Sequence, residues 1–222
     1  MIKGIDISHW NGDIDFDKVK ASGIEFVIIK AGGSDRGFYK DPKFEANYKK
    51  AKAAGLFVGA YYFVGKKFYG ILSGASDARR FIDMLKGMQF EYPVFLDVET
   101  TDARYKELAT DAAISFCTEL EEAGYFVGIY ASDIGGFKEK LNHERIMKYT
   151  HWVARYGKDP EYCEDGNIVQ YSSRGSVDGI SGSVDLDNSK VDFSKIIKEK
   201  GFNGFNKEEK QTKKSKKAQK EV

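Results

Sequence analysis

The stretch Tyr92-Pro93-Val94-Phe95-Leu96-Asp97-Val98-Glu99-Thr100 joins an uninterrupted apolar run to an Asp-x-Glu pair. Such a run is typical of a parallel strand that is buried on both of its faces. In barrels and in open α/β sheets, the carboxyl ends of parallel strands carry the active site. The stretch therefore predicts an α/β fold in which two acids stand at the functional edge of the sheet.

The two acids of this stretch are placed to act on one substrate bond. Side chains two residues apart on a strand point to the same face, so Asp97 and Glu99 are expected about 6.6 Å apart along it. Paired carboxyl groups at such a separation are typical of glycoside hydrolysis. The alternative is that the acids only cap the next segment or pair with lysines. The buried run that precedes them favours the catalytic interpretation.

The rest of the chain alternates strand-like runs with helix-like stretches. Strands are expected over residues 4–8, 26–30, 57–63, 94–98, 126–130, 152–154 and 168–171. Helices are expected over 42–54, 75–86 and 109–123, each ending near a glycine, as helix C-termini commonly do. This order favours a parallel sheet with right-handed crossovers. Seven or eight strands in about 200 residues favour a compact barrel, with an open doubly wound sheet as the alternative.

Composition and charge fit a soluble domain and argue against a nucleic-acid binder. The 222 residues are 41% hydrophobic and 14% aromatic, enough to bury a sizeable core. The formal net charge is +1, but residues 207–222 carry +4, which leaves −3 for the remainder. A nearly neutral body lacks the basic surface that nucleic acid requires, so no such partner is expected. From about Gly201 the chain turns polar and lysine-rich, which predicts a domain at 1–198 and a disordered tail or linker at 199–222.

No motif for a cofactor or a metal stands out. Neither Gly-x-Gly-x-x-Gly after the first strand nor Gly-x-x-x-x-Gly-Lys-Ser/Thr occurs, so no nucleotide cofactor is expected. Cys117 in an expected helix and Cys163 in an expected loop have no metal-ligand spacing to the three histidines. Free thiols and no metal site are therefore expected, and His9 and His151 are interpreted as structural or rim residues.

Two further aspartates extend the acidic site. Asp6 ends the first apolar run, and Asp185 lies in Val184-Asp185-Leu186-Asp187 near the end of the domain. Together with Asp97 and Glu99, they would place several carboxyl groups at one barrel mouth. Mutual repulsion there would raise at least one pKa and keep a proton available at neutral pH. The sequence thus predicts a general acid.

Six ordered blocks and a closing segment carry a family resemblance. The blocks are Gly4-Ile5-Asp6-Ile7-Ser8-His9-Trp10-Asn11-Gly12, Phe26-Val27-Ile28-Ile29-Lys30-Ala31, Gly59-Ala60-Tyr61-Tyr62-Phe63, residues 93–99, Gly128-Ile129-Tyr130 and Gln170-Tyr171-Ser172-Ser173, followed by residues 177–187. In order and spacing, the chain resembles family 25 of the glycoside hydrolases over residues 2 to about 195. These are the Chalaropsis-type lysozymes, or N-acetylmuramidases, of bacteria and phage endolysins.

The resemblance implies a fold and an activity. The fold is a flattened, irregular TIM-like (β/α) barrel with parallel strands, and the activity is cleavage of the β-1,4 bond between N-acetylmuramic acid and N-acetylglucosamine in peptidoglycan. By position, Glu99 resembles the general acid that protonates the leaving oxygen. Asp97 resembles its partner, which either stabilises the oxocarbenium-like transition state or orients the substrate's acetamido group. Asp6 and Asp185 resemble the remaining acids of the cleft, which tune Glu99 and hold the sugar.

Aromatic side chains are expected to line a sugar cleft, since the apolar face of a pyranose packs on a ring. The expected substrate-binding residues are Tyr61, Tyr62, Tyr130, Trp152 and Gln170. Tyr61 and Tyr130 match positions that face the cleft in the family, so they rank above Tyr62. An aromatic residue in a buried strand is more often part of the core, and Trp10 and Trp152 fit the core equally well.

Two positions depart from the family pattern. Val169 stands where a tryptophan often precedes Gln-Tyr, and Asp187 stands where the family usually has asparagine. The valine would weaken the packing of the cleft wall. Asp187 adds a charge that either raises the pKa values of nearby acids or faces solvent. We expect these two changes to alter substrate preference more than activity.

Two other functions stay open as alternatives. A catalytically silent wall-binding barrel would recognise glycan without cutting it, but it has no need of acids at 6, 97, 99 and 185. A chitinase-like hydrolase ends a strand in a similar Asp-x-Glu pair, but its usual longer acidic run is absent from residues 92–96.

The resemblance also implies a setting. The expected partner is bacterial cell-wall peptidoglycan, with no cofactor, no membrane insertion and a monomeric state. No apolar run is long enough to span a membrane, and residues 1–6 lack the apolar core of a signal peptide. This pattern fits a phage endolysin that accumulates in the cytoplasm and is released through a holin-type pore, or a secreted enzyme whose leader has been removed.

Overall fold

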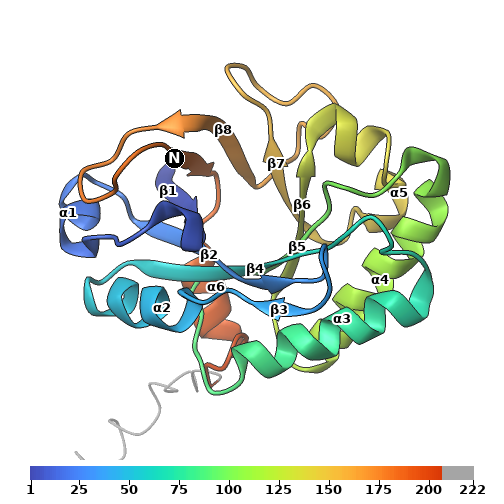
Figure 1. Ribbon diagram of the computed structural model, residues 1–222, viewed down its shortest axis with the longest axis horizontal. Coiled ribbons are helices and arrows are strands. Elements are labelled where there is room, and N and C mark those ends of the chain that lie inside the picture. The colour runs from blue at the N-terminus through green and yellow to red at the C-terminus, as the bar shows by residue number, and fades with distance from the viewer. Residues whose placement is uncertain (207–222) are drawn as a thin grey trace, which may run out of the picture.

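Eight strands close into a barrel in the computed structural model, which describes residues 1–206 (Figure 1). In chain order they are β1 (Ile2–Ile7), β2 (Phe26–Gly33), β4 (Phe57–Phe63), β5 (Val94–Asp97), β6 (Val127–Ser132), β7 (Thr150–Ala154), β8 (Ile168–Gly175) and β9 (Val184–Ser189). Strand β1 pairs with both β2 and β9, which closes the sheet. The two-residue strand β3 (Tyr39–Lys40) adds to β2 outside this ring. The expected α/β barrel is thereby confirmed.

Strand direction differs from the expectation at one place. Neighbouring strands from β1 through β2 and β4 to β8 run parallel, whereas β9 runs antiparallel to both β8 and β1. Only residues 176–183 connect β8 to β9. A parallel connection needs a dozen or more residues, so this short link returns the chain in the opposite direction.

The helices lie outside the barrel wall or across its end. The three expected helices are present as α2 (Phe44–Ala53), α3 (Gly70–Leu85) and α4 (Lys106–Glu122), and Figure 1 shows them along one side of the barrel. Three short helices, α1 (Phe16–Ala21), α5 (His143–Ile146) and α6 (Phe193–Lys200), complete the α-helices of residues 1–206. Three further helical segments of other types, η1 (His9–Asn11), η2 (Ala103–Tyr105) and η3 (Asp133–Lys138), follow β1, β5 and β6.

Strand alternation divides the core into two layers. Val94 and Leu96 of β5 pack outward into the layer shared with the helices, whereas Phe95 packs inside the barrel. The inner layer continues to α6, whose Phe193 ring lies 5.6 Å from the ring of Tyr92, centroid to centroid. Because side chains alternate along a strand, Asp97 follows Phe95 onto the inner face. The buried strand therefore delivers its acid to the barrel interior.

The packed domain continues beyond the boundary expected at residue 198. Asn203 is fully buried, and its side-chain amide donates to the carbonyl oxygens of Phe90 (3.2 Å) and Tyr92 (2.9 Å). Its side-chain oxygen accepts a hydrogen bond from the Phe126 backbone N–H at 2.7 Å. Contacts of Phe202, Asn203 and Phe205 thus extend the packing past residue 198. The expected tail over 207–222 lies outside the described residues.

The remaining sequence expectations concern cysteines and membranes. Cys117 lies in α4 and Cys163 in the loop between β7 and β8, and both are buried and outside any disulfide, as expected. Among residues 1–206, no helix has both the length and the apolarity needed to cross a bilayer.

Candidate active site

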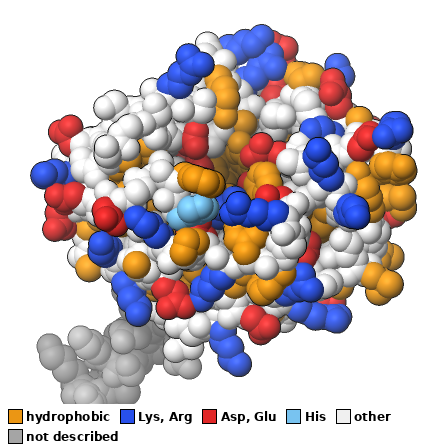
Figure 2. All heavy atoms as spheres, in the orientation of Figure 1, with side chains coloured by type: hydrophobic (Ala, Val, Ile, Leu, Met, Phe, Trp, Pro, Cys, Tyr) orange, Lys and Arg blue, Asp and Glu red, His pale blue; other side chains and the backbone are white. Residues whose placement is uncertain are grey.

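The four predicted acids line one cavity of about 220 Å³ at the barrel mouth, which we call the carboxylate cavity. Its lining consists of Asp6, Ser8, Trp10, Lys30, Tyr61, Phe63, Asp97, Glu99, Tyr130, Trp152, Tyr156, Gln170 and Asp185. Figure 2 shows acidic and hydrophobic side chains around a hollow near the centre of the face viewed. The mixture of acids and rings is the chemistry expected of a sugar site.

The strand register explains why acids that are distant in sequence meet here. Asp6 of β1 and Asp185 of β9 are direct neighbours across the sheet. Asp97 ends β5 opposite Phe63 of β4 on one side and Tyr130 of β6 on the other. Glu99 follows two residues later on the same face. Parallel strands β1 and β5 end at this edge and antiparallel β9 begins there, which brings these carboxyl groups together.

Burial and mutual repulsion perturb the two deepest carboxyl groups. Desolvation raises the pKa of Asp6 well above its ordinary value, and the charges of Asp187 and Asp185 raise it further. Desolvation also raises the pKa of Asp97, with Glu99 adding to the shift and the Lys30 ammonium opposing it. The cavity therefore holds protons at a pH where free aspartic acid is ionised.

Glu99 occupies a different environment from Asp97. Its side chain reaches solvent at the cavity mouth, whereas Asp97 is buried. Surrounding protein atoms still desolvate the Glu99 carboxyl group and raise its pKa, while Lys30 and Lys140 oppose that shift. Lys140 also donates a hydrogen bond to the Glu99 carbonyl oxygen. A carboxyl group with a raised pKa at an open mouth can both hold a proton and deliver it to a ligand.

Gln170 organises one wall of the cavity. Its amide nitrogen donates to Asp6 Oδ2 at 2.7 Å, and its oxygen accepts hydrogen bonds from the hydroxyl groups of Tyr130 and Tyr156, both at 2.9 Å. The expected substrate-binding residue is therefore itself held in place by three partners. It fixes the orientation of Asp6 and of two tyrosine rings at once.

The predicted aromatic residues divide into cavity and core. Tyr61, Tyr130 and Trp152 line the cavity, with the Tyr130 and Trp152 rings 4.4 Å apart. Tyr62 is fully buried in the outer layer, packs against Phe81, and donates from its hydroxyl group to Asp77 at 3.2 Å. The prediction of Tyr62 as a sugar contact is therefore wrong, because adjacent strand residues point to opposite faces.

Several lining residues were not singled out by the sequence. Lys30 ends a predicted strand, and its ammonium lies 4.4 Å from the Phe63 ring centre, in reach of the acids whose pKa values it lowers. The alternative of Trp10 as a core residue is wrong, because Trp10 is 77% exposed at the rim. It lies against His9, which contacts Asp41 through Nδ1 at 2.7 Å. The usable signal for Lys30 was its position at the carboxyl end of a strand. Tyr156 comes from the β7–β8 loop, where no such signal exists.

The two departures from the family pattern lie in different places. Asp187 is buried beneath the cavity, and its Oδ1 accepts a hydrogen bond from Trp152 Nε1 at 2.7 Å. Desolvation raises the pKa of Asp187 to about 8, and the charge of Asp185 adds to the shift. Of the two expectations for Asp187, an effect on nearby acids is supported, since its charge raises the pKa of Asp6, and the solvent-facing position is wrong. Val169 instead lines a separate surface groove with Tyr171.

A larger groove of about 910 Å³ adjoins the cavity, since Phe63 lines both. Its lining includes the cationic residues Arg36, Lys66, Lys67 and Arg80. The groove offers space and positive charge for parts of a ligand that extend beyond the carboxylate cavity.

Comparison with known proteins gives consistent matches over most of the chain. The profile of the family described as Glycosyl hydrolases family 25 matches residues 5–180. The autolytic lysozyme of Clostridium acetobutylicum is 33% identical over 187 residues, which cover 84% of this chain and 55% of that protein. Lysozyme M1 of Streptomyces globisporus is 31% identical over 212 residues, which cover 83% of this chain and 66% of that protein. The chain thus spans about half the length of the first of these relatives and under two thirds of the second.

Solved structures agree with these sequence matches. The CTP1L endolysin superposes with a TM-score of 0.78 at 29% identity, covering 89% of this chain and 70% of that one. The bacterial lysozyme of Streptomyces coelicolor superposes with a TM-score of 0.73 at 27% identity, covering 86% of this chain and 92% of that one.

Proposed function

This chain belongs to glycosyl hydrolase family 25, and from that premise we propose that it is a peptidoglycan hydrolase of the N-acetylmuramidase type. The bond cleaved is the β-1,4 bond from N-acetylmuramic acid to N-acetylglucosamine. The observation that carries the proposal is the pairing of Glu99, with a raised pKa at the open mouth, with Asp97 buried behind it. A pair of carboxyl groups in unlike environments supplies the two roles that glycoside hydrolysis needs.

Glu99 is the general acid. Desolvation keeps its proton to a higher pH, and its position at the mouth gives the leaving glycosidic oxygen access to that proton. Proton transfer to that oxygen breaks the bond without releasing a free alkoxide. After transfer, the Glu99 carboxylate is stabilised by Lys30 and Lys140.

Asp97 acts on the muramic residue whose bond is cleaved. Its Oδ1 is buried and accepts no hydrogen bond from any residue in the described range 1–206. That oxygen is free to accept the N–H of the 2-acetamido group and to hold the acetamido oxygen toward the reacting carbon. In its ionised form, the Asp97 carboxylate stabilises the positive charge that develops on the sugar ring.

The remaining acids and rings position the sugar. Gln170 holds Asp6, and the register places Asp185 beside it, so two carboxyl groups face one wall of the cavity. Tyr61, Tyr130 and Trp10 supply ring surfaces for the apolar faces of the pyranoses. The cationic groove next to the cavity suits the acidic lactyl and peptide substituents of peptidoglycan.

The biological setting follows from the substrate. Similarity to an endolysin and to an autolytic lysozyme supports action on a bacterial cell wall. We propose that the protein acts there as a monomer without a nucleic-acid partner. Light scattering on the protein peak from a size-exclusion column would test the monomeric state. A mass twice that of the chain would contradict it.

Product analysis tests the proposed bond and the proposed acid together. Purified peptidoglycan is digested with the wild type, Glu99→Gln and the exposed control Glu122→Gln, and the products are reduced and identified by mass spectrometry. We expect reduced muramic ends from the wild type and the control, and none from Glu99→Gln. Reduced glucosaminyl ends would move the cleavage to the other glycosidic bond. Intact binding without cleavage by the wild type would instead favour a silent wall-binding barrel, and cleavage of chitin oligomers alone would favour a chitinase-like hydrolase.

A further inference from the structure

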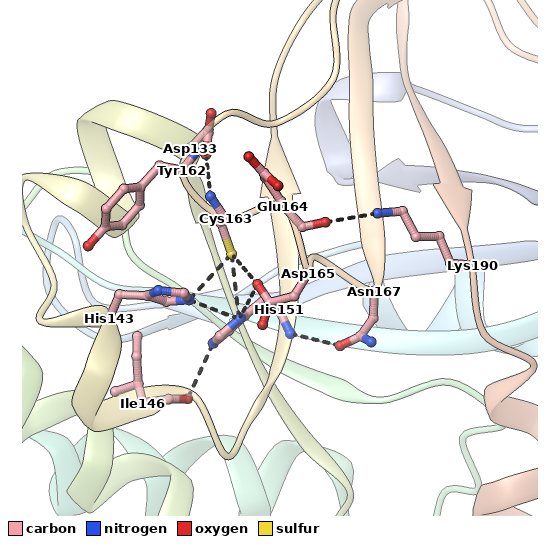
Figure 3. Close-up of polar contacts among 10 residues, drawn as sticks. All are labelled: Asp133, His143, Ile146, His151, Tyr162, Cys163, Glu164, Asp165, Asn167 and Lys190. Carbon is pink, nitrogen blue, oxygen red and sulfur yellow. Dashed lines mark hydrogen bonds and ion pairs between the residues drawn. The ribbon is translucent and has the colours of Figure 1, made fainter.

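Four metal-ligating side chains converge on the outer side of the barrel, away from the carboxylate cavity. They are His143, His151, Cys163 and Asp165, which we call the His-His-Cys-Asp cluster. His143 begins α5, His151 lies in β7, and the other two lie in the β7–β8 loop. Trp152 faces the barrel interior, so the adjacent His151 faces outward. Figure 3 shows the four side chains pointing toward one another.

The sulfur and the two imidazole nitrogens of this cluster are spaced as three ligands of a tetrahedral site. The Asp165 carboxylate stands farther out, since the four ligand atoms lie within 4.8 Å of one another, and it would reach the ion by a rotation of its exposed side chain. Cys163 Sγ lies 3.5 Å from His143 Nε2, from His151 Nδ1 and from Asp165 Oδ1. The two imidazole nitrogens are 3.4 Å apart, and His151 Nδ1 lies 4.0 Å from Asp165 Oδ1. In a tetrahedral zinc site with Zn–S of about 2.3 Å and Zn–N of about 2.0–2.1 Å, sulfur and nitrogen ligands stand about 3.5 Å apart and two nitrogens about 3.4 Å apart.

We propose that the His-His-Cys-Asp cluster binds a structural zinc ion. Two neutral imidazoles, one thiolate and one carboxylate complete a four-coordinate site of the type that zinc prefers. The thiolate and the carboxylate together balance the two positive charges of the ion. When the ion binds, the Zn–S bond forms and the Cys163 thiol proton leaves to solvent.

Hydrogen bonds alone account poorly for the same arrangement. A thiol has one hydrogen to donate and its sulfur accepts only weakly, so hydrogen bonds give Sγ weak partners where three polar neighbours lie at 3.5 Å. The pairing of His151 Nε2 with the Ile146 carbonyl oxygen at 3.2 Å requires a proton on Nε2, which leaves Nδ1 without one in the neutral ring. A cation at the centre satisfies Nδ1, Sγ and the other two ligands simultaneously.

Residues around the cluster hold its ligands as outer partners do in metal sites. The Ile146 carbonyl oxygen fixes the ring orientation and tautomer of His151. The buried Asp133 carboxylate accepts hydrogen bonds from the backbone N–H groups of Glu161 (2.8 Å), Tyr162 (3.1 Å) and Cys163 (2.9 Å). The β7–β8 loop is therefore shaped to present Cys163 to the histidines.

The site is closed, which indicates a structural role. Cys163 is 0% exposed and His151 2% exposed, and four protein ligands leave no position for a substrate. The ion would tie the β7–β8 loop to β7 and α5. The same loop carries Tyr156, which hydrogen-bonds Gln170 in the carboxylate cavity. Zinc thus supports the loop that completes one wall of that cavity.

This proposal departs from the sequence expectation of no metal site. The cysteine and histidines lie 8 to 20 residues apart and carry no zinc-finger spacing. The barrel brings them together only because α5, β7 and the following loop meet on one side.

Metal content and cobalt substitution test the proposal. The untagged protein is analysed for zinc by mass spectrometry, together with Cys163→Ser and the matched control Cys117→Ser, whose buried thiol lies in α4. We expect about one zinc per chain in the wild type and the control, and none in Cys163→Ser. Cobalt added to the zinc-free protein should give the visible bands of a tetrahedral site and a thiolate charge-transfer band, both absent from Cys163→Ser.

A second variant and a stability measurement distinguish the loss of a metal ligand from a folding defect. Asp165 is exposed, so Asp165→Ala should remain folded by circular dichroism while binding zinc at least about tenfold more weakly. Removing zinc from the wild type should lower Tm by about 5–10 °C, and restoring zinc chloride should reverse the loss. A folded wild type that takes up neither zinc nor cobalt would overturn the proposal. Unchanged metal binding by Cys163→Ser and Asp165→Ala would overturn it as well.

Discussion

Titratable side chains have opposite surroundings in the carboxylate cavity and in the His-His-Cys-Asp cluster. The cavity buries its acids and places like charges close together, which raises the pKa values of Asp6 and Asp97. Asp97 Oδ1 has no hydrogen-bond partner among residues 1–206. The cluster surrounds one point with complementary ligands that a single cation satisfies. A carboxyl group that acts on a substrate keeps an oxygen without a protein hydrogen bond, whereas side chains that stabilise the fold have all their partners within it. The comparison assigns chemistry to the first region and stability to the second.

The largest expected effect comes from removing the proton donor. Glu99→Gln should lower kcat by about 10²–10⁴-fold, because the amide cannot protonate the leaving oxygen. Its Tm should stay close to that of the wild type, since Glu99 reaches solvent and carries little packing. Turnover of a soluble peptidoglycan fragment and a thermal melt measure the two quantities. A large fall in Tm would mean that Glu99 also stabilises the fold. The division between a catalytic cavity and a stabilising cluster would then be wrong.

A smaller loss is expected from the buried partner. Asp97→Asn should lower kcat by about 10²–10³-fold, because the amide has no charge to stabilise the transition state. Removing a desolvated acid beside Glu99 should leave the free energy of unfolding unchanged or raise it. Denaturant unfolding of the variant measures this directly. A clear loss of stability would show that the Asp97 carboxyl group is satisfied in the fold after all.

The variant Asp187→Asn tests how much the buried, closely spaced acids lower the stability of the fold. The folded pKa of Asp187, about 8, exceeds the unfolded value, so the folded state binds the extra proton and stability falls as pH rises from about 4 to about 8. Asp187→Asn retains an acceptor for Trp152 Nε1 and should raise stability at pH 8 by about 2 kcal/mol, or about 4–8 °C in Tm. The gain should vanish near pH 4. The exposed control Asp178→Asn should change neither value, and a gain independent of pH would contradict the assignment.

The smallest effect concerns the tuning of Glu99. Lys140 lowers the Glu99 pKa, so Lys140→Met should raise it and move the basic limb of the kcat profile to higher pH. The direction follows because a general acid works only while protonated. Lys138→Met, an exposed neighbour, is the control. A shift to lower pH would indicate that a group other than Glu99 controls the basic limb.

The sequence predicted those parts of the molecule that depend on local patterns. The apolar run before Asp97 identified a buried strand. The predicted acids met as expected, because β1 and β5 end at the edge where antiparallel β9 begins. Tyr62 was misplaced because a shift of one residue reverses the face of a strand. The antiparallel β9 escaped prediction, since its direction depends on a short link rather than on its own residues.

Residues brought together by distant segments left no sequence signal. Tyr156 enters the cavity from an irregular loop, and the zinc ligands come from α5, β7 and that loop. Asn203 fastens the end of the domain through contacts more than seventy residues away in the chain, as to Phe126. Such positions follow from tertiary packing, which neither periodicity nor spacing records.

The most direct test compares Glu99→Gln with zinc-free wild type in one peptidoglycan digestion at 25 °C, with zinc content, circular dichroism and reduced sugar ends measured on the same samples. We predict that Glu99→Gln is folded and zinc-bound but releases no muramic ends, whereas the folded zinc-free protein releases them at a rate within about tenfold of the wild type. Release of muramic ends by Glu99→Gln at the wild-type rate would contradict the assignment of the chemistry to the carboxylate cavity.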